Sequence, residues 1–157
     1  LAFSVKSTSD IASVSGPADL AGKKVIVGSG TNQERILLGW NAENEAAGRQ
    51  PALPVYLTDD ASGNLYIQSG RADVFFGPQS VAAYKAALSG KTKVVGLGPK
   101  KAYVATTTRK GNGLVYALQA ALDGAIARGE YQKVLARWGE QGEEVRQSEV
   151  NPPGITY

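Results

Sequence analysis

The chain has 157 residues, of which 43% are hydrophobic and 20% are charged, and it carries a formal net charge of +3. A chain of this length is expected to bury roughly 70% of the surface that its unfolded form exposes, which suits an ordinary globular domain and excludes a disordered or fibrous chain. The absence of cysteine and histidine excludes disulfides, thiolate chemistry and histidine-based catalysis, and the scattered basic residues predict no nucleic-acid partner.

The first part of the chain is expected to alternate short strands with helices. Residues 2–6 alternate weakly between apolar and polar and predict a strand, which a polar loop over 7–17 follows. Val25-Ile26-Val27 is a short apolar run typical of a strand buried on both faces. The turn Gly28-Ser29-Gly30-Thr31 then leads into a helix over about 32–47. The order of strand, glycine turn and helix is half of a βαβ unit.

The same alternation continues to residue 98. Further strands are expected over 52–57, 74–76 and 93–95, with helices over 61–69 and 79–88 between them. We therefore predict an α/β fold, in which helices flank a mainly parallel sheet and the crossovers are right-handed.

The last part of the chain predicts two helices. Apolar residues over 114–126 recur at helical spacing, which indicates the first of them. A second, shorter helix carries Tyr131 and Trp138 on its apolar face, and these rings, like that of Trp40, are expected in the core. The polar residues 141–157 predict an extended tail.

Three stretches of the sequence carry a family resemblance. They are residues 19–31, residues 69–77, which read Ser-Gly-Arg-Ala-Asp-Val-Phe-Phe-Gly, and the segment 107–139, which ends in Arg137-Trp138-Gly139. Taken in this order, they resemble the bacterial extracellular solute-binding proteins of family 3, the periplasmic amino-acid-binding proteins of ABC importers. The resemblance covers the second lobe and the C-terminal part of the first lobe of that family's fold.

The resemblance also implies a division of the chain. Members of the family have two periplasmic-binding-protein-like α/β lobes, joined by two crossing strands, with the ligand between them. Residues 1–6 would be a hinge strand, 7–98 the second ligand-binding lobe, and 99–157 the hinge return with the C-terminal helices of the first lobe. On this division, the N-terminal half of the first lobe would be absent from the sequence. The implied location is extracytoplasmic, in the periplasm or as a cell-surface lipoprotein.

The first candidate ligand site is the loop at the carboxyl end of the strand 25–27. Ligands bind at such edges of open parallel sheets, and the free N–H groups of a helix start favour an anion such as a carboxylate. The resemblance carries ligand binding to this loop, to residues Ser29, Gly30, Thr31, Asn32 and Gln33. The alternative is that Ser29 or Thr31 only caps its own helix, with Thr31 and Glu34 forming a capping box.

The second candidate is the segment Gly77, Pro78 and Gln79, which follows the strand 74–76 and opens onto the same edge. Many receptors of the family have an aspartate at the position of Pro78, where it pairs with the ammonium group of the ligand. Proline offers neither a charge nor an N–H donor. Asp59 and Asp60 could supply a negative charge instead, or could cap the next helix. Arg71 and Asp73 are expected to be structural, in a turn between a helix and a strand.

These features predict binding without chemistry. The resemblance implies the substrate-binding component of an ABC importer, which binds a small polar metabolite such as an amino acid, expected to carry a carboxylate, and delivers it to a membrane permease. No catalytic residue, cofactor or metal site is expected, because no paired carboxylates stand out for acid–base work. The alternative is a ligand-sensing effector domain of a signalling or regulatory protein, since such proteins also carry two-lobed α/β domains.

Overall fold

The computed structural model describes residues 1–57, 60–99 and 104–153. The chain falls into two compact units, unit 1 (Leu1–Lys100) and unit 2 (Lys101–Tyr157). Asp59, one of the candidates above, lies outside the described residues, as does the side chain of Asp60.

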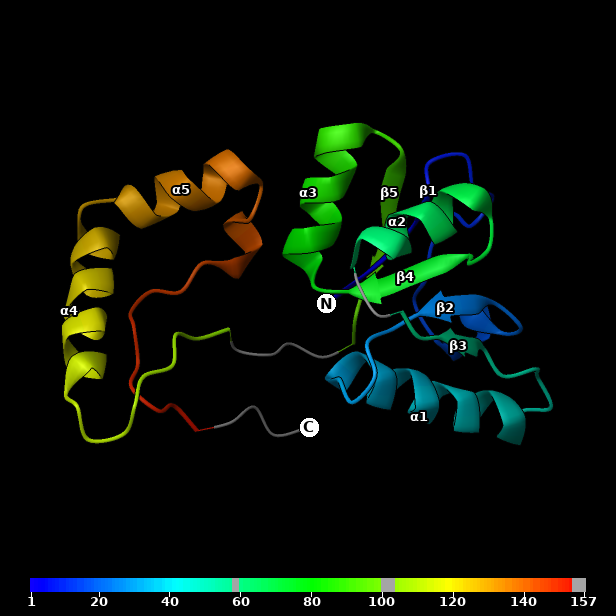
Figure 1. Cartoon of the computed structure of the whole chain (residues 1–157), viewed down its shortest axis with the longest axis horizontal. Coiled ribbons are helices and arrows are strands. Elements are labelled where there is room, and N and C mark those ends of the chain that lie inside the picture. Colours follow the sequence, from blue (N-terminus) through cyan, green and yellow to red (C-terminus); the bar gives the residue numbers. More distant parts are fainter. Residues whose placement is uncertain (58–59, 100–103, 154–157) are drawn as a thin grey trace. The chain divides into compact units, whose positions relative to one another are not determined.

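Unit 1 is built on one five-stranded sheet with the order β3-β2-β4-β1-β5 (Figure 1). Strand β2 pairs in parallel with β3 and β4, whereas β1 pairs antiparallel with β4 and β5. Four strands therefore run in one direction and β1 alone opposes them. The predicted α/β fold and its shared sheet are confirmed, with β1 as an antiparallel member inside the sheet. The strands are β1 (Ala2–Lys6), β2 (Lys24–Ile26), β3 (Leu53–Val55), β4 (Val74–Gly77) and β5 (Thr92–Leu97).

Helices cover both faces of this sheet, because neighbouring residues of β2 and β4 are buried in two different core clusters. Val25 and Phe76 belong to a core cluster that includes Leu37 of α1 (Asn32–Ala46), and Trp40 of the same helix packs against this cluster. Ile26 belongs to a second cluster with Ile67 of α2 (Asp60–Ser69). Since side chains of a strand alternate between its faces, α1 and α2 pack on opposite sides. The remaining helical elements of the unit are η1 (Pro17–Leu20) and α3 (Gln79–Ser89).

Strand β1 anchors the larger of these clusters. Ala2, Phe3, Ser4 and Val5 are all buried, because the strand has a neighbour on each side and packing on each face. The Phe3 ring stacks on Phe76, with a centroid distance of 4.1 Å, and on Trp40, with a distance of 5.4 Å. Trp40 packs against the core as predicted, although its side chain is only half-buried.

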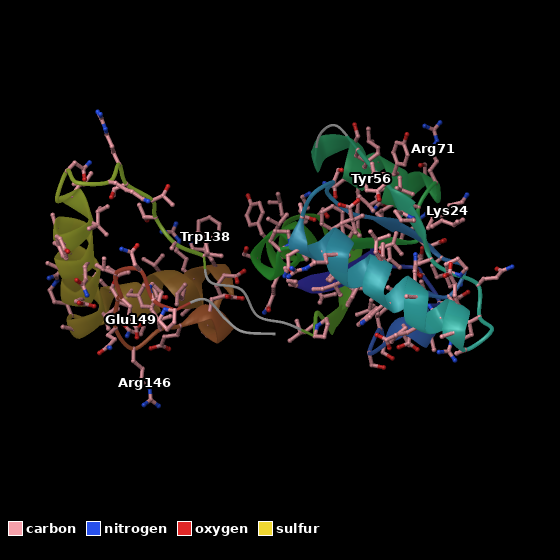
Figure 2. The ribbon with its side chains drawn as sticks, turned by 90° about the horizontal axis from the view of Figure 1, so that it is seen from below. Lys24, Tyr56, Arg71, Trp138, Arg146 and Glu149 are labelled. Atoms are coloured by element: carbon pink, nitrogen blue, oxygen red, sulfur yellow. The ribbon has the colours of Figure 1, made fainter. Side chains whose placement is uncertain are left out.

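The turn between α2 and β4 holds two strands in register. The Asp73 carboxylate accepts the backbone N–H of Lys24 at 2.8 Å, and the backbone N–H of Asp73 donates to the Lys24 carbonyl at 2.9 Å. The Arg71 guanidinium lies over the Tyr66 ring, 5.6 Å from its centroid. Lys24 and Arg71 both project from the surface of the unit (Figure 2). The predicted structural role of Arg71 and Asp73 is confirmed.

Unit 2 contains α4 (Leu114–Ala127), α5 (Glu130–Trp138) and the short η2 (Gln141–Glu143). Its tail is tied to α4, because Gln119 donates to the Ser148 carbonyl at 2.9 Å and the Ser148 N–H donates to Asp123 at 2.6 Å. Both predicted helices are present, but neither contains a buried residue.

The predicted core position of Trp138 is wrong, since its side chain is 52% exposed (Figure 2). The described part of unit 2 offers no sheet against which this helix face could pack. None of the helices in the described ranges is both long and apolar enough to span a membrane.

Candidate functional site

The loop between β2 and α1 is fixed by hydrogen bonds that the side chains of Thr31 and Glu34 make within it. Thr31 is the N-cap of α1, and its hydroxyl accepts the Glu34 N–H at 3.3 Å while donating to the Gly28 carbonyl at 2.7 Å. The Glu34 carboxylate in turn accepts the Gly30 N–H at 2.6 Å. The capping role is therefore confirmed, although Glu34 reaches back to Gly30 rather than to Thr31 itself, as a capping box requires.

A second strand braces the same loop. The Tyr56 hydroxyl, just beyond β3, hydrogen-bonds to Glu34 and holds the pKa of this carboxyl below its ordinary value, and the Gly30 N–H adds to this effect. The same bond raises the pKa of Tyr56. The Glu34 carboxylate thus ties the glycine turn to the end of β3.

The start of α1 leaves donors free for a ligand. The N–H groups of Asn32 and Gln33 stand in the first turn, where the helix itself supplies no acceptor. No acceptor within the described ranges bonds to either backbone group. The Thr31 hydroxyl, by contrast, is occupied with Gly28 and Glu34. The backbone is therefore the better source of donors in this loop.

A second helix begins at the same edge of the sheet. Pro78 is the N-cap of α3, which follows β4, and its side chain makes no capping hydrogen bond. Strand β4 pairs in parallel with β2, so the carboxyl ends of both strands point the same way. Gly77 leaves room for the Phe75 ring beside the turn, because a Cβ there would lie 2.3 Å from this ring.

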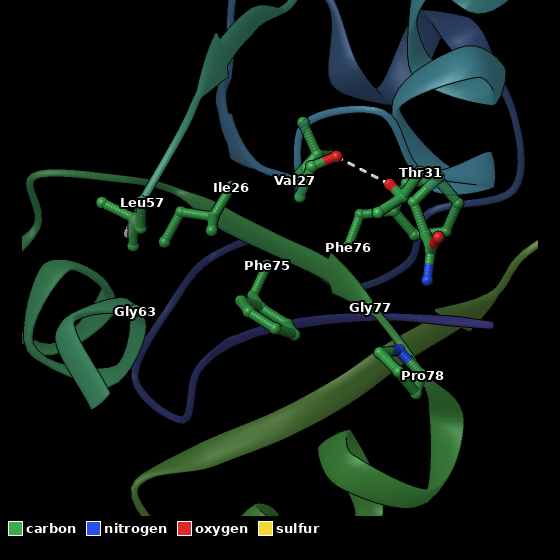
Figure 3. Close-up of a pocket in the computed structure, with 11 residues that line it drawn as sticks. Ile26, Val27, Thr31, Leu57, Gly63, Phe75, Phe76, Gly77 and Pro78 are labelled. Atoms are coloured by element: carbon green, nitrogen blue, oxygen red, sulfur yellow. Dashed lines mark hydrogen bonds between the residues drawn. The ribbon is translucent and has the colours of Figure 1, made fainter. Parts of the chain in front are cut away.

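A pocket of about 280 Å³ lies where the ends of β2, β3 and β4 meet (Figure 3). Thr31 and Gln33 line it from the start of α1, and Gly77 and Pro78 line it from the start of α3. Leu57 and Gly63 contribute from the β3 and α2 side. The residues that line the pocket, all of them described, carry no ionisable side chain.

Comparison with models of known protein families finds no match, and comparison with curated proteins finds none. Among solved structures, the chain is similar to a probable amino-acid ABC transporter extracellular-binding protein from Bacillus subtilis, with 24% identity, 90% of this chain and 60% of that chain covered, and a TM-score of 0.71. The chain has the fold of amino-acid ABC transporter substrate-binding proteins.

Two further structures agree on this fold. A putative L-cystine ABC transporter protein from Listeria monocytogenes gives 23% identity, 94% and 61% coverage, and a TM-score of 0.68. An ancestral arginine-binding protein, bound to arginine, gives 26% identity, 87% and 58% coverage, and a TM-score of 0.64. The chain spans about three fifths of the length of each of these substrate-binding proteins. The resemblance seen in the sequence is thus confirmed at the level of the fold.

In this substrate-binding-protein fold, the eight predicted site residues divide into three groups. Thr31, Gln33, Gly77 and Pro78 line the pocket. Gly30 and Asn32 line a second hollow, of about 460 Å³, which shares Thr31 with the pocket. Ser29 and Gln79 line neither. Their assignment as ligand-binding residues stays a prediction, as does that of the other six.

Sequence reasoning missed the apolar wall of the pocket, which consists of Ile26, Leu57 and Phe75. Phe75 could have been found from the alternation of β4, which turns it to the face opposite Val74 and Phe76. No sequence pattern indicated that Gly63 lines the pocket, because its place there depends on how α2 packs against the sheet. A Cβ at Gly63 would lie 3.5 Å from the Phe75 ring and 3.6 Å from Leu57.

The groups at this site are suited to binding. Its polar groups are backbone N–H donors, the amide of Gln33 and the hydroxyl of Thr31, while the rest of the lining is apolar. Within the described residues no group of three or more aspartates and glutamates could hold a metal ion. Such a site can hold a small molecule that carries an anionic group.

Proposed function

We propose that the chain is a substrate-binding component of an ABC importer, which binds a small polar metabolite through its carboxylate and carries out no chemistry. The observation that carries this proposal is the meeting of two helix starts, α1 and α3, at one pocket on the carboxyl edge of adjacent parallel strands. Ligands bind at this place in open α/β sheets. The shared fold with amino-acid substrate-binding proteins supports the same role.

A carboxylate is the ligand group that the helix starts favour. The dipole of a helix stabilises an anion at its N-terminus by about 0.3 to 1 kcal/mol, and by up to about 2 kcal/mol in a partly buried site. The free N–H groups of Asn32 and Gln33 can each donate a charge-assisted hydrogen bond. Solved substrate-binding proteins of this fold are described as bound to arginine and to glutamine, both of which carry a carboxylate.

The wider arrangement of the importer belongs to the same proposal. In this proposal the first hinge strand is residues 1–6 and the second ligand-binding lobe is residues 7–98. Residues 99–157 contain the hinge return and the C-terminal helices of the first lobe. The start of β1 and the end of β5 support this division, because they pair side by side and the Gly98 N–H donates to the Leu1 carbonyl at 2.9 Å. The partner is a membrane permease, and the protein works outside the cytoplasm.

The test is an NMR titration of the 15N-labelled chain with L-glutamine, L-leucine, L-arginine and 4-methyl-2-oxopentanoate. We expect at least one of them to shift the amide signals of Gln33 and Gly77 in a saturable way. Gly63→Leu should abolish these shifts, because the new side chain enters the pocket beside Phe75 and Leu57. Gly39→Leu is the matched control, since Gly39 is also helical but has nothing within 4 Å of its Cβ position.

Two results would contradict the proposal. One is that none of the four compounds shifts the Gln33 and Gly77 signals. The other is that Gly63→Leu leaves the shifts unchanged, which would put the binding site elsewhere.

A further inference from the structure

We infer that this pocket selects a carboxylate whose body is neutral and apolar and which has no ammonium group beside the carboxylate. The inference rests on the proposed function and adds to it the chemical class of the ligand. Three features of the pocket carry it: an apolar wall, a set of positive groups near that wall, and an uncharged residue at the start of α3.

The apolar wall faces the helix starts across the pocket (Figure 3). It consists of Ile26, Leu57 and Phe75, and Gly63 leaves room in front of the last two. Only glycine at position 77 allows the Phe75 ring to lie where it does. A ligand that places its carboxylate at the helix starts therefore brings the rest of its body against hydrocarbon, which favours an apolar body.

The positive groups are the two helix starts at the pocket and a lysine that contacts the apolar wall. The starts of α1 and α3 each carry the partial positive charge of a helix N-terminus. The Lys85 ammonium group lies over the Phe75 ring, 5.2 Å from its centroid, so a full positive charge stands beside the wall. A cationic group of a ligand in the pocket would be repelled by all three groups and would lose its water as well.

The residue at the start of α3 reinforces this selection. Pro78 lines the pocket with ring carbons and cannot accept a hydrogen bond through its side chain. An ammonium group next to the ligand carboxylate would lie close to this helix start. It would find no charged partner in Pro78, and an unpaired charged donor is costly to bury.

The first experiment compares two ligands that differ at a single carbon. L-Leucine and 4-methyl-2-oxopentanoate share their carboxylate and branched body, but only leucine has the ammonium group. We expect the oxo acid to bind at least about tenfold more tightly, as measured from the Gln33 and Gly77 amide shifts. L-Arginine, whose body ends in a cation, should give no saturable shift.

The second experiment inverts the preference. Pro78→Asp should strengthen leucine binding and weaken oxo-acid binding, each by about tenfold, because it places a carboxylate at the start of α3. Aspartate is a favoured N-cap residue, so α3 should still form. Ser80→Asp is the matched control, since it adds the same charge to the first turn of α3 at an exposed position outside the pocket lining. It should leave the order of the two ligands unchanged.

The outcomes separate the inference from the proposed function. Leucine or arginine binding as tightly as the oxo acid would overturn the inference and leave the proposed function standing. The inference would also be overturned, and the proposed function would stand, if the double variant Asp59→Asn, Asp60→Asn abolished leucine binding. One of these carboxylates would then pair with the ammonium group of leucine. Absence of any shift at Gln33 and Gly77 would instead contradict the proposed function itself.

Discussion

The two units of the chain use similar helices to very different effect. Every buried hydrophobic residue in the described ranges belongs to unit 1, and the only buried residue of unit 2 is Glu140. Yet α4 is rich in apolar residues, and its Leu114 and Leu118 are 49% and 38% exposed. In α1 of unit 1, by contrast, Leu37 is fully buried against the sheet.

This difference shows that a helix can carry an apolar stripe without being part of a packed core. Helical spacing of apolar residues is a local property of the sequence, and it is present in both units. Burial needs a partner surface, which the sheet supplies in unit 1. Because the burial of apolar surface is the dominant favourable contribution to folding, we expect most of the stability of the described chain to reside in unit 1.

The largest expected effect is the loss of the Phe3 ring from unit 1. Phe3→Ala removes a side chain that is fully buried and stacked on Phe76 and Trp40. Substitutions of this kind cost about 3 to 5 kcal/mol of the free energy of unfolding. The measurement is a urea titration followed by NMR. The indole N–H signal of Trp40 reports on unit 1, and that of Trp138, the other tryptophan, reports on unit 2.

Leu118→Ala in α4 is the control for that substitution. Its side chain is 38% exposed, so we expect a change within about 1 kcal/mol in the unfolding seen by Trp138. In the unchanged protein, the Trp138 signal should also disappear at a lower urea concentration than the Trp40 signal. The expected difference between the units would be wrong if both indole signals showed one shared unfolding transition. It would also be wrong if Phe3→Ala and Leu118→Ala lost the same amount of unfolding free energy.

Much of this fold could be predicted from the sequence, where the signal was local. The apolar run Val25-Ile26-Val27 gave β2, and the spacing over 114–126 gave α4 almost to its ends. The residues 2–6 predicted a strand but not its place, because its pairing with β4 and β5 joins segments far apart in the sequence. The buried Ser4 also breaks the simple rule that polar residues face outward.

The candidate site could be predicted in part for the same reason. Thr31 and Pro78 lie in the connections that lead from β2 to α1 and from β4 to α3, so strand order alone brought them to the pocket. Gly63 and Leu57 reach it only because α2 packs on the face that carries Phe75, which no local pattern states. The exposure of Trp138 could not be predicted either, since the same helical spacing occurs in buried and in exposed helices.

A smaller loss of unfolding free energy is expected when one asparagine in each unit is replaced by alanine. Asn44 is fully buried; its amide donates to the Pro17 carbonyl at 2.7 Å and accepts from Arg49 at 2.8 Å. Asn44→Ala leaves the partly buried Pro17 carbonyl without its donor, which should cost about 1 to 3 kcal/mol. The Asn112 side chain accepts the exposed N–H of Leu114 at 3.1 Å, so Asn112→Ala should cost less than about 1 kcal/mol.

The indole signals of Trp40 and Trp138 in a urea titration also measure the effects of these two asparagine substitutions. Asn44→Ala should move only the unfolding midpoint of Trp40, and Asn112→Ala only that of Trp138, by the smaller amount. If Asn112→Ala proved as costly as Asn44→Ala, unit 2 would contain a packed region that its exposed helices do not suggest.

The smallest expected effect is a pH dependence of opposite sign in the two units. In unit 1, hydrogen bonds from the N–H and hydroxyl of Ser15 and from the Gly16 N–H hold the pKa of Asp19 below its ordinary value of 3.8. The unfolded chain then binds this proton more readily than the folded one. The stability that the ionised Asp19 contributes is therefore present above 3.8 and is lost as the pH falls through the lower, folded pKa.

In unit 2 the sign is reversed at Glu140. Burial, and then the charge of Glu143, raise the pKa of the Glu140 carboxyl above its ordinary value of 4.5, so the folded unit binds this proton more readily than the unfolded one. Unit 2 should therefore gain stability as the pH falls through the window just above 4.5, while unit 1 is unaffected there by Asp19. Glu140→Gln, which imitates the protonated acid, should flatten the dependence seen by Trp138. Asp19→Asn should flatten the one seen by Trp40 below 3.8. If the urea midpoints of both indole signals instead decreased as the pH was lowered toward 4.5, the folded unit would not raise the pKa of Glu140, and the predicted difference in sign between the units would be wrong.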